Sequence, residues 1–112
     1  MIEYLKLQQT FFEQRTTRPI AYRIQQLKRL KKLLKKNEDE FNKAIYLDFK
    51  KSAFDTTTTE MNLLYSELDN AIAHVTKWAA TQAKKTNLTN LPGRSYVIAE
   101  PLGVSLVIGA WN

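Results

Sequence analysis

The last thirteen residues, 100–112, limit most strongly what this chain can fold into. Four apolar residues, most of them β-branched, lie close together here: Val104, Leu106, Val107 and Ile108. Pro101 and Gly103 precede them and Gly109 follows. Such a run is typical of a strand covered on both faces, as in a parallel α/β sheet. Because that sheet needs more strands and helices than 112 residues supply here, we expect the front piece of a larger protein, cut after its first core strand.

Composition narrows the classes of protein and of site. The 112 residues are 44% hydrophobic and 11% aromatic, which fits one small domain or a piece of a larger one and argues against disorder. The chain has no cysteine, so disulfides, thiolate metal sites and thiol nucleophiles are excluded within it. Absence of cysteine is compatible with a reducing compartment, and we expect a cytoplasmic location.

No targeting or membrane segment is expected. The first residues lack a basic region followed by an apolar one, which a signal peptide would need. The longest apolar run, residues 104–110, is far shorter than the roughly 20 residues of a membrane helix.

The net charge of +6 is distributed unevenly, with eight basic residues and no acidic one between Arg18 and Lys36. One interpretation is a surface for nucleic acid or an anionic membrane. The other is the solvated face of an amphipathic helix, opposite Ile20, Ile24, Leu27 and Leu34. We favour the helix face and expect no nucleic-acid partner, because no aromatic side chains interleave with residues 28–36 to stack on bases.

The first half of the chain has the periodicity of three helices, at about residues 2–15, 19–36 and 37–49. Pro19 suits the first turn of the second helix, where its missing N–H costs nothing. Asn37 and Glu40 have the spacing of a capping box at the start of the third.

A fourth and longest helix follows a connector at residues 50–55. Asp55, or Thr57 paired with Glu60, can begin it, and the four-threonine run 56–59 is interpreted as the helix entrance. Its predicted inner face has apolar residues at spacings of three and four: Met61, Leu64, Leu68, Ile72, Val75 and Trp78. His74 is the only histidine, so we expect no metal site.

The second half changes from helix to sheet. Residues 84–93 are polar and contain Pro92 and Gly93, which predicts a loop. Residues 95–100 alternate weakly, as in a strand with one face less buried. We therefore predict a mostly α-helical chain of about four helices followed by one or two β-strands: a helical part at 1–86, a loop at 87–94, and a strand segment at 95–112 that leads into a core strand.

The same final segment resembles a known family. Residues Glu100-Pro101-Leu102-Gly103-Val104, Ile108 and Trp111-Asn112 match the pattern E-P-L-G-V-x-x-x-I-x-x-W-N of the NAD(P)-dependent aldehyde dehydrogenases. Upstream, Thr17-Arg18-Pro19-Ile20 and Arg23-Ile24-Gln25-Gln26-Leu27 resemble the first helices of the short-N-terminus, class 3 or fatty-aldehyde branch. The resemblance covers essentially the whole chain and implies an α/β parent enzyme with a Rossmann-like cofactor domain.

By that resemblance Asn112 is a catalytic residue, whose side-chain N–H donates to the substrate oxygen as negative charge develops. From its spacing alone, Asn112 would be an ordinary loop residue. Gly109, Ala110 and Trp111 would line the nicotinamide side of the cofactor. The family's catalytic cysteine and glutamate, and its Gly-rich cofactor turn, would lie beyond residue 112.

Two functional hypotheses follow. The first is the N-terminal part of an enzyme that oxidises an aldehyde to a carboxylic acid with NAD or NADP, homodimeric as a whole. The piece alone would be inactive, bind no cofactor and self-associate through residues 95–108, whose strand edges lack partners. The alternative is a free-standing helical adaptor whose basic helix binds nucleic acid or an anionic membrane. Continuation of the gene past Asn112 into Tyr-Pro, and later a Gly-Gln-x-Cys segment, would distinguish the two.

Overall fold

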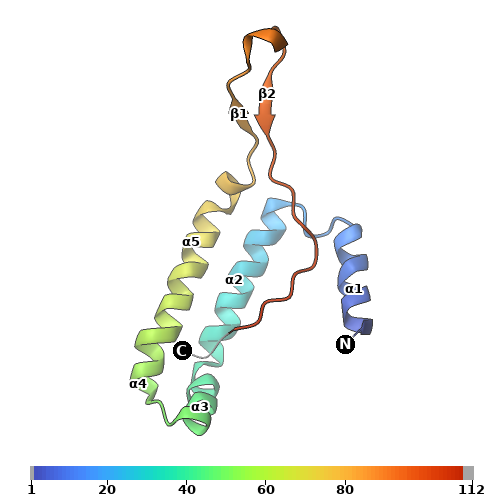
Figure 1. Cartoon of the computed structure of the whole chain (residues 1–112). Coiled ribbons are helices and arrows are strands. Elements are labelled where there is room, and N and C mark those ends of the chain that lie inside the picture. Colours follow the sequence, from blue (N-terminus) through green and yellow to red (C-terminus); the bar gives the residue numbers. More distant parts are fainter. Residues whose placement is uncertain (1, 110–112) are drawn as a thin grey trace. The chain divides into compact units, whose positions relative to one another are not determined.

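The computed structural model describes residues 2–109, and the chain is mostly helical, as predicted (Figure 1). In chain order its elements are α1 (Ile2–Glu13), α2 (Ile20–Lys36), α3 (Glu38–Phe49), α4 (Ala53–Thr56), the π-helical turn η1 (Thr57–Met61), α5 (Asn62–Trp78), β1 (Gln82–Lys84), the 3-10 turn η2 (Leu88–Asn90) and β2 (Ser95–Val97). The elements α4, η1 and α5 follow one another without a break, so they correspond to the single long helix that the periodicity predicts.

The chain divides into two compact units, which are described separately. Arg23–Val75 form the helical unit. The residues up to Tyr22 together with those from Thr76 onwards form the second, which we call the hairpin unit.

The core of the helical unit is small. Its buried hydrophobic side chains are Met61 and Leu68. Thr56, a few residues before Met61, is fully buried as well. Of the predicted inner face of the long helix, Ile72 and Val75 are half-buried, whereas Leu64 is exposed. The α2 helix contributes no fully buried residue. The unit therefore leaves much apolar surface uncovered.

Polar contacts link α2 to α5 within the helical unit. The Lys31 ammonium donates to both carboxylate oxygens of Asp69, at 2.5 and 2.6 Å. One turn further on, Lys35 Nζ lies 5.4 Å from the ring centroid of Tyr65, within the range of a cation–π interaction.

Asn37 ends α2 and does not cap α3 through its side chain. Its Nδ2 donates to the Leu33 carbonyl oxygen at 2.8 Å, and no side-chain cap bond forms at the start of α3. The predicted capping box with Glu40 is therefore wrong. The α2 and α3 helices are separated by Asn37 alone, and its side-chain amide bonds the Leu33 carbonyl, which also accepts the Asn37 backbone N–H at 3.1 Å.

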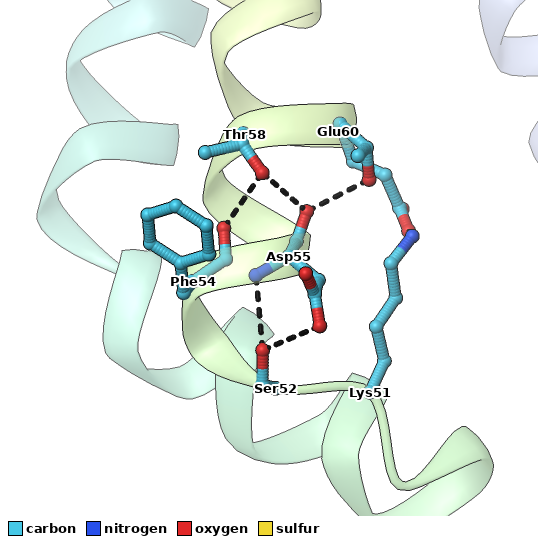
Figure 2. A network of polar contacts seen from close by, with 7 residues as sticks. Lys51, Ser52, Phe54, Asp55, Thr58 and Glu60 are labelled. Atoms are coloured by element: carbon cyan, nitrogen blue, oxygen red, sulfur yellow. Dashed lines mark hydrogen bonds and ion pairs between the residues drawn. The ribbon is translucent and has the colours of Figure 1, made fainter.

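The long helix begins at Ser52, earlier than predicted (Figure 2). Ser52 Oγ accepts from the Asp55 backbone N–H at 3.1 Å and donates to Asp55 Oδ2 at 2.6 Å. Serine at the N-cap satisfies a backbone donor that the first helical turn would leave unpaired. Lys51 Nζ forms an ion pair with Glu60 across this start.

The threonine run lies inside the helix, not at its entrance. Thr58 Oγ1 donates to the Phe54 carbonyl at 2.9 Å (Figure 2). Thr59 Oγ1 donates to the Asp55 carbonyl at 2.7 Å. Threonine hydroxyls that bond to a carbonyl one turn earlier compete with the helical ladder and bend it. The π-helical turn coincides with these bonds, which is where a local widening of the helix is expected.

The described residues of the hairpin unit contain one antiparallel strand pair. The strands β1 and β2 align Gln82 with Val97, Ala83 with Tyr96 and Lys84 with Ser95. At the loop end, Thr86 Oγ1 accepts from the Ser95 N–H at 2.9 Å and closes the pair. The strand predicted at 95–100 is thus present in its first half, whereas β1 was not predicted.

The strand predicted at residues 104–108 is not formed. Residues 98–109, up to the last one that the structure describes, have no regular secondary structure. Leu106, Val107 and Ile108 are 83–87% exposed. A strand apolar on both faces requires hydrogen-bonded neighbours at its edges and covering helices, and the described residues provide neither here.

Candidate functional site

The predicted site residues lie at the edge of the described structure. Ala110, Trp111 and Asn112 are outside the described residues, so their roles stay predictions. Gly109 is described, and no atom lies within 4 Å of where a Cβ on it would stand. Its surroundings are open, and the described part of the chain brings no other chemical group to it.

What the structure does describe is the segment that leads to these residues. We call Glu100–Gly103 the lead-in segment. At its first residue, Glu100 Oε2 accepts a hydrogen bond from Arg18 Nη2 in an ion pair. The two side chains are 59% and 44% exposed, so water screens the pair, and its contribution to stability is small.

The last residue of the lead-in segment lies against α1. Gly103 has φ +114°, a conformation that side-chain-bearing residues rarely adopt, and a Cβ added to it would lie 3.8 Å from Phe12 Cε1. Phe12 belongs to the last turn of α1, and Gly103 is half-buried there. The lead-in segment is thus paired with Arg18 at its first residue, and its last residue lies near Phe12.

The turn between α1 and α2 and the lead-in segment together line a cavity of about 290 Å³. It is lined by Phe12, Glu13, Arg15, Thr17, Arg18, Glu100 and Pro101. Arg15 has φ 60°, the left-handed conformation, and its carbonyl accepts from the Arg18 N–H at 3.0 Å. This turn places Arg18 within ion-pair distance of Glu100. Two arginines and two glutamates line the cavity, so its formal charges balance.

Several basic side chains between Arg18 and Lys36 contact acidic or aromatic residues of the same chain. Lys31 binds Asp69, Lys35 lies over Tyr65, and Arg18 binds Glu100. Tyr65 in turn donates to Glu38 Oε2 at 2.9 Å. Side chains that face acidic and aromatic partners on neighbouring elements are typical of a helix surface in a folded protein. These contacts favour the interpretation of the basic residues as an ordinary helix face over that of a nucleic-acid surface.

The described residues provide no metal site of the usual kind. In residues 2–109 no group of three histidine, cysteine, aspartate or glutamate side chains is placed to hold a metal ion. His74 Nδ1 lies 2.9 Å from the Asn70 carbonyl oxygen of its own helix. None of the helices described is both long and apolar enough to cross a membrane.

Sequence reasoning missed the pairing of Arg18 with Glu100. Arg18 lies in Thr17-Arg18-Pro19-Ile20, and Glu100 begins the final motif. These are two of the segments that carry the family resemblance. Nothing in the sequence indicates that they contact one another across 82 positions.

Residues 5–112 match the model of the aldehyde dehydrogenase family. Aldehyde dehydrogenase family 3 comG of Dictyostelium discoideum is 37% identical over 106 residues, which is 95% of this chain and 22% of that protein. Aldehyde dehydrogenase family 3 member A2 of Mus musculus is 36% identical over 98% of this chain and 22% of its own length. The chain thus spans about a fifth of the length of these relatives.

A solved structure described as the substrate-bound state of Staphylococcus aureus AldH has a similar fold. It superposes with a TM-score of 0.85 at 29% identity, over 90% of this chain and 22% of that one.

Proposed function

This chain belongs to the aldehyde dehydrogenase family, and we propose from that membership that it is the N-terminal part of an enzyme oxidising an aldehyde to a carboxylic acid with NAD or NADP. The observation that carries the proposal is the family match over residues 5–112, which includes the motif at 100–112. The free-standing adaptor, which binds through its basic helix, fits these relatives less well.

In this proposal Asn112 binds the oxygen of the substrate. Its amide N–H is neutral and directional, and donates without a protonation step. A donor aimed at the developing oxyanion stabilises the transition state more than the ground state. The nucleophile and the base would come from residues beyond this chain.

We propose by the same resemblance that Gly109 lies beside the cofactor. NAD or NADP, when bound, would supply the hydride acceptor. Ala110 and Trp111 complete the proposed lining by resemblance.

Assembly and location belong to the same proposal. The hairpin of β1 and β2 is a two-stranded sheet, and its outer edges offer unpaired backbone groups to another chain. We propose a homodimer for the whole enzyme, in the cytoplasm. One relative is named a dimeric, NADP-preferring aldehyde dehydrogenase of Canis lupus familiaris, which supports the dimer.

The test uses the full-length enzyme with aliphatic and aromatic aldehydes and either cofactor. Formation of the reduced cofactor is followed by absorbance. Asn112→Ala should lower turnover about 10²–10³-fold, with cofactor affinity nearly unchanged, because the lost bond belongs to the transition state. Asn112→Asp should be at least as damaging, since a carboxylate repels the developing charge.

Two outcomes would contradict the proposal. A wild-type enzyme that oxidises no aldehyde removes the activity. Equal turnover in wild type and Asn112→Ala removes Asn112 from the site and leaves only the family fold. The 112-residue chain by itself should reduce no NAD or NADP above a blank, because it has no cysteine nucleophile.

A further inference from the structure

The structure divides the basic residues of α2 into two groups. Lys31 and Lys35 contact side chains of α5. Arg29, Lys32 and Lys36, in contrast, are exposed, and none of the three forms an ion pair within the described part of the chain. The contacts with α5 therefore explain the first group of charges and leave the second group unexplained.

The second group lies on one face of α2, with an exposed leucine among the charges. Residues 29, 32, 33 and 36 follow spacings of three and four, which place side chains on the same side of a helix. Leu33 is 47% exposed, and Leu30, three positions before it, is 46% exposed. We call Arg29, Lys32, Leu33 and Lys36 the cationic face.

Repulsion between like charges acts within the cationic face. Lys36 lies one turn after Lys32, and Lys28 lies one turn before it. Like charges at this spacing destabilise a helix. The sequence of α2 contains no acidic residue that could offset them. An anionic surface placed against this face would therefore lower the free energy of the helix.

We propose that the cationic face is a docking surface for an anionic lipid membrane, along which α2 lies. The arginine and lysine side chains bind the charged lipid headgroups, and Leu33 enters the boundary between headgroups and acyl chains. The proposal concerns the surface of the whole enzyme and not a free-standing adaptor. It goes beyond the proposed function and does not depend on it.

The exposed leucine favours lipid over nucleic acid as the partner. A phosphate backbone gives an apolar side chain nothing to pack against, whereas a lipid interface buries it. Residues 28–36 also contain no aromatic side chain that could stack on bases. The positive charges fit either partner, so Leu33 is the residue that distinguishes them.

The test is sedimentation of the full-length enzyme with vesicles of phosphatidylcholine that contain about one third phosphatidylserine. We expect binding to these vesicles but not to pure phosphatidylcholine, and weaker binding as salt is added. Each basic residue near an anionic leaflet raises the affinity about 5-fold, so replacing Arg29, Lys32 and Lys36 together by glutamine should weaken binding about 100-fold. Leu33→Ala alone should weaken it about 5-fold, because less apolar surface is buried.

A matched control removes the same amount of charge from other exposed positions. Lys6, Lys77 and Lys85 are exposed and belong to the hairpin unit. Their joint replacement by glutamine should leave vesicle binding within about 2-fold of wild type, because distant charges are screened. Glutamine favours helix about as well as lysine and arginine, so the variants of the cationic face should unfold at the wild-type temperature. Thermal unfolding followed by circular dichroism checks this.

The proposal is overturned if the wild-type enzyme does not sediment with the anionic vesicles, as it would not if later parts of the enzyme cover this face. Equal losses of binding in the two triple variants also overturn it, because binding would then follow net charge alone. So does tighter binding to a short double-stranded RNA than to the vesicles, with Leu33→Ala without effect. An enzyme that oxidises no aldehyde yet binds the vesicles through this face contradicts the proposed function alone.

Discussion

The Tyr65 hydroxyl on α5 donates a 2.9 Å hydrogen bond to Oε2 of Glu38, the first residue of α3. Burial, together with the hydrogen bond and the negative charge of Glu38, raises the pKa of Tyr65 to about 12. Tyrosine in the unfolded chain ionises near pH ~10. Between these values the unfolded state binds fewer protons than the folded state, so stability falls as the pH rises.

The first prediction concerns this pH dependence. The contribution of Tyr65 is fully present below pH ~10 and is lost progressively as the pH approaches ~12. Tyr65→Phe should remove that part of the alkaline loss, and a tyrosinate absorbance titration should lose one late-ionising phenol. Glu38→Gln should move the pKa of Tyr65 back toward its ordinary value without reaching it, because burial remains. A titration unchanged by Tyr65→Phe would contradict the assignment.

A second prediction compares two leucines on α5. Leu68 is 6% exposed and Leu63 is 61% exposed. Leu68→Ala should lower the free energy of unfolding by roughly 2–3 kcal/mol, at the lower end for core leucines because the core is small. Leu63→Ala should change it by less than about 0.5 kcal/mol. Chemical denaturation of both variants checks this, and similar losses would mean that the buried face is assigned incorrectly.

The third prediction concerns the end of α3. Lys50 has φ 58°, a left-handed conformation, and its N–H donates to the Tyr46 carbonyl at 2.8 Å. Glycine adopts this conformation without steric cost, so Lys50→Gly should stabilise the fold by about 0.5–1 kcal/mol. Lys50→Ala keeps the strain and loses the ammonium that lies 5.2 Å from the Tyr46 ring centroid, so it should destabilise. A stability ranking with alanine above glycine would refute the strain argument.

A fourth prediction tests the N-cap in Figure 2. Ser52→Ala removes the acceptor for the Asp55 N–H and should cost about 1 kcal/mol of stability. Ser66→Ala, an exposed serine within α5, provides the control and should be neutral or slightly stabilising, because alanine favours helix. Equal effects of the two substitutions would show that Ser52 does not cap the helix.

The fifth prediction concerns Gly103 in the full-length enzyme. Its φ of +114° would cost an alanine about 1–3 kcal/mol of local strain, so Gly103→Ala should shift the lead-in segment and lower turnover. Ser105→Ala, two residues on, should behave as wild type. Steady-state kinetics of both variants measure this, and normal turnover in Gly103→Ala would remove the need for the positive φ.

The helices were predictable from the sequence because their signals are local. The break at residues 16–19, the charges of α2 and the apolar spacing of α5 each depend on residues within a turn or two of one another. The errors at helix starts have local causes too. Asn37 could bond either the preceding or the following helix, and the pattern alone did not decide between them.

Strand β1 and the Arg18–Glu100 pair were not predictable, because both depend on distant residues. Gln82, Ala83 and Lys84 include no β-branched or aromatic residue and all are exposed, so pairing with β2 alone makes them a strand. The opposite error at residues 104–108 has the same origin: strong strand propensity produces no strand where no neighbouring strand is in reach.

The exposed apolar run at 104–108 also has a consequence for the order of events during synthesis. The helical unit comprises residues 23–75, all of which leave the ribosome before the run 104–108, so we expect this unit to fold first. The run 104–108, in contrast, must wait for later-made strands of the proposed enzyme before it is covered. During that interval the exposed hydrophobic segment of the nascent chain can bind chaperones, or associate wrongly with neighbouring chains on the same polysome.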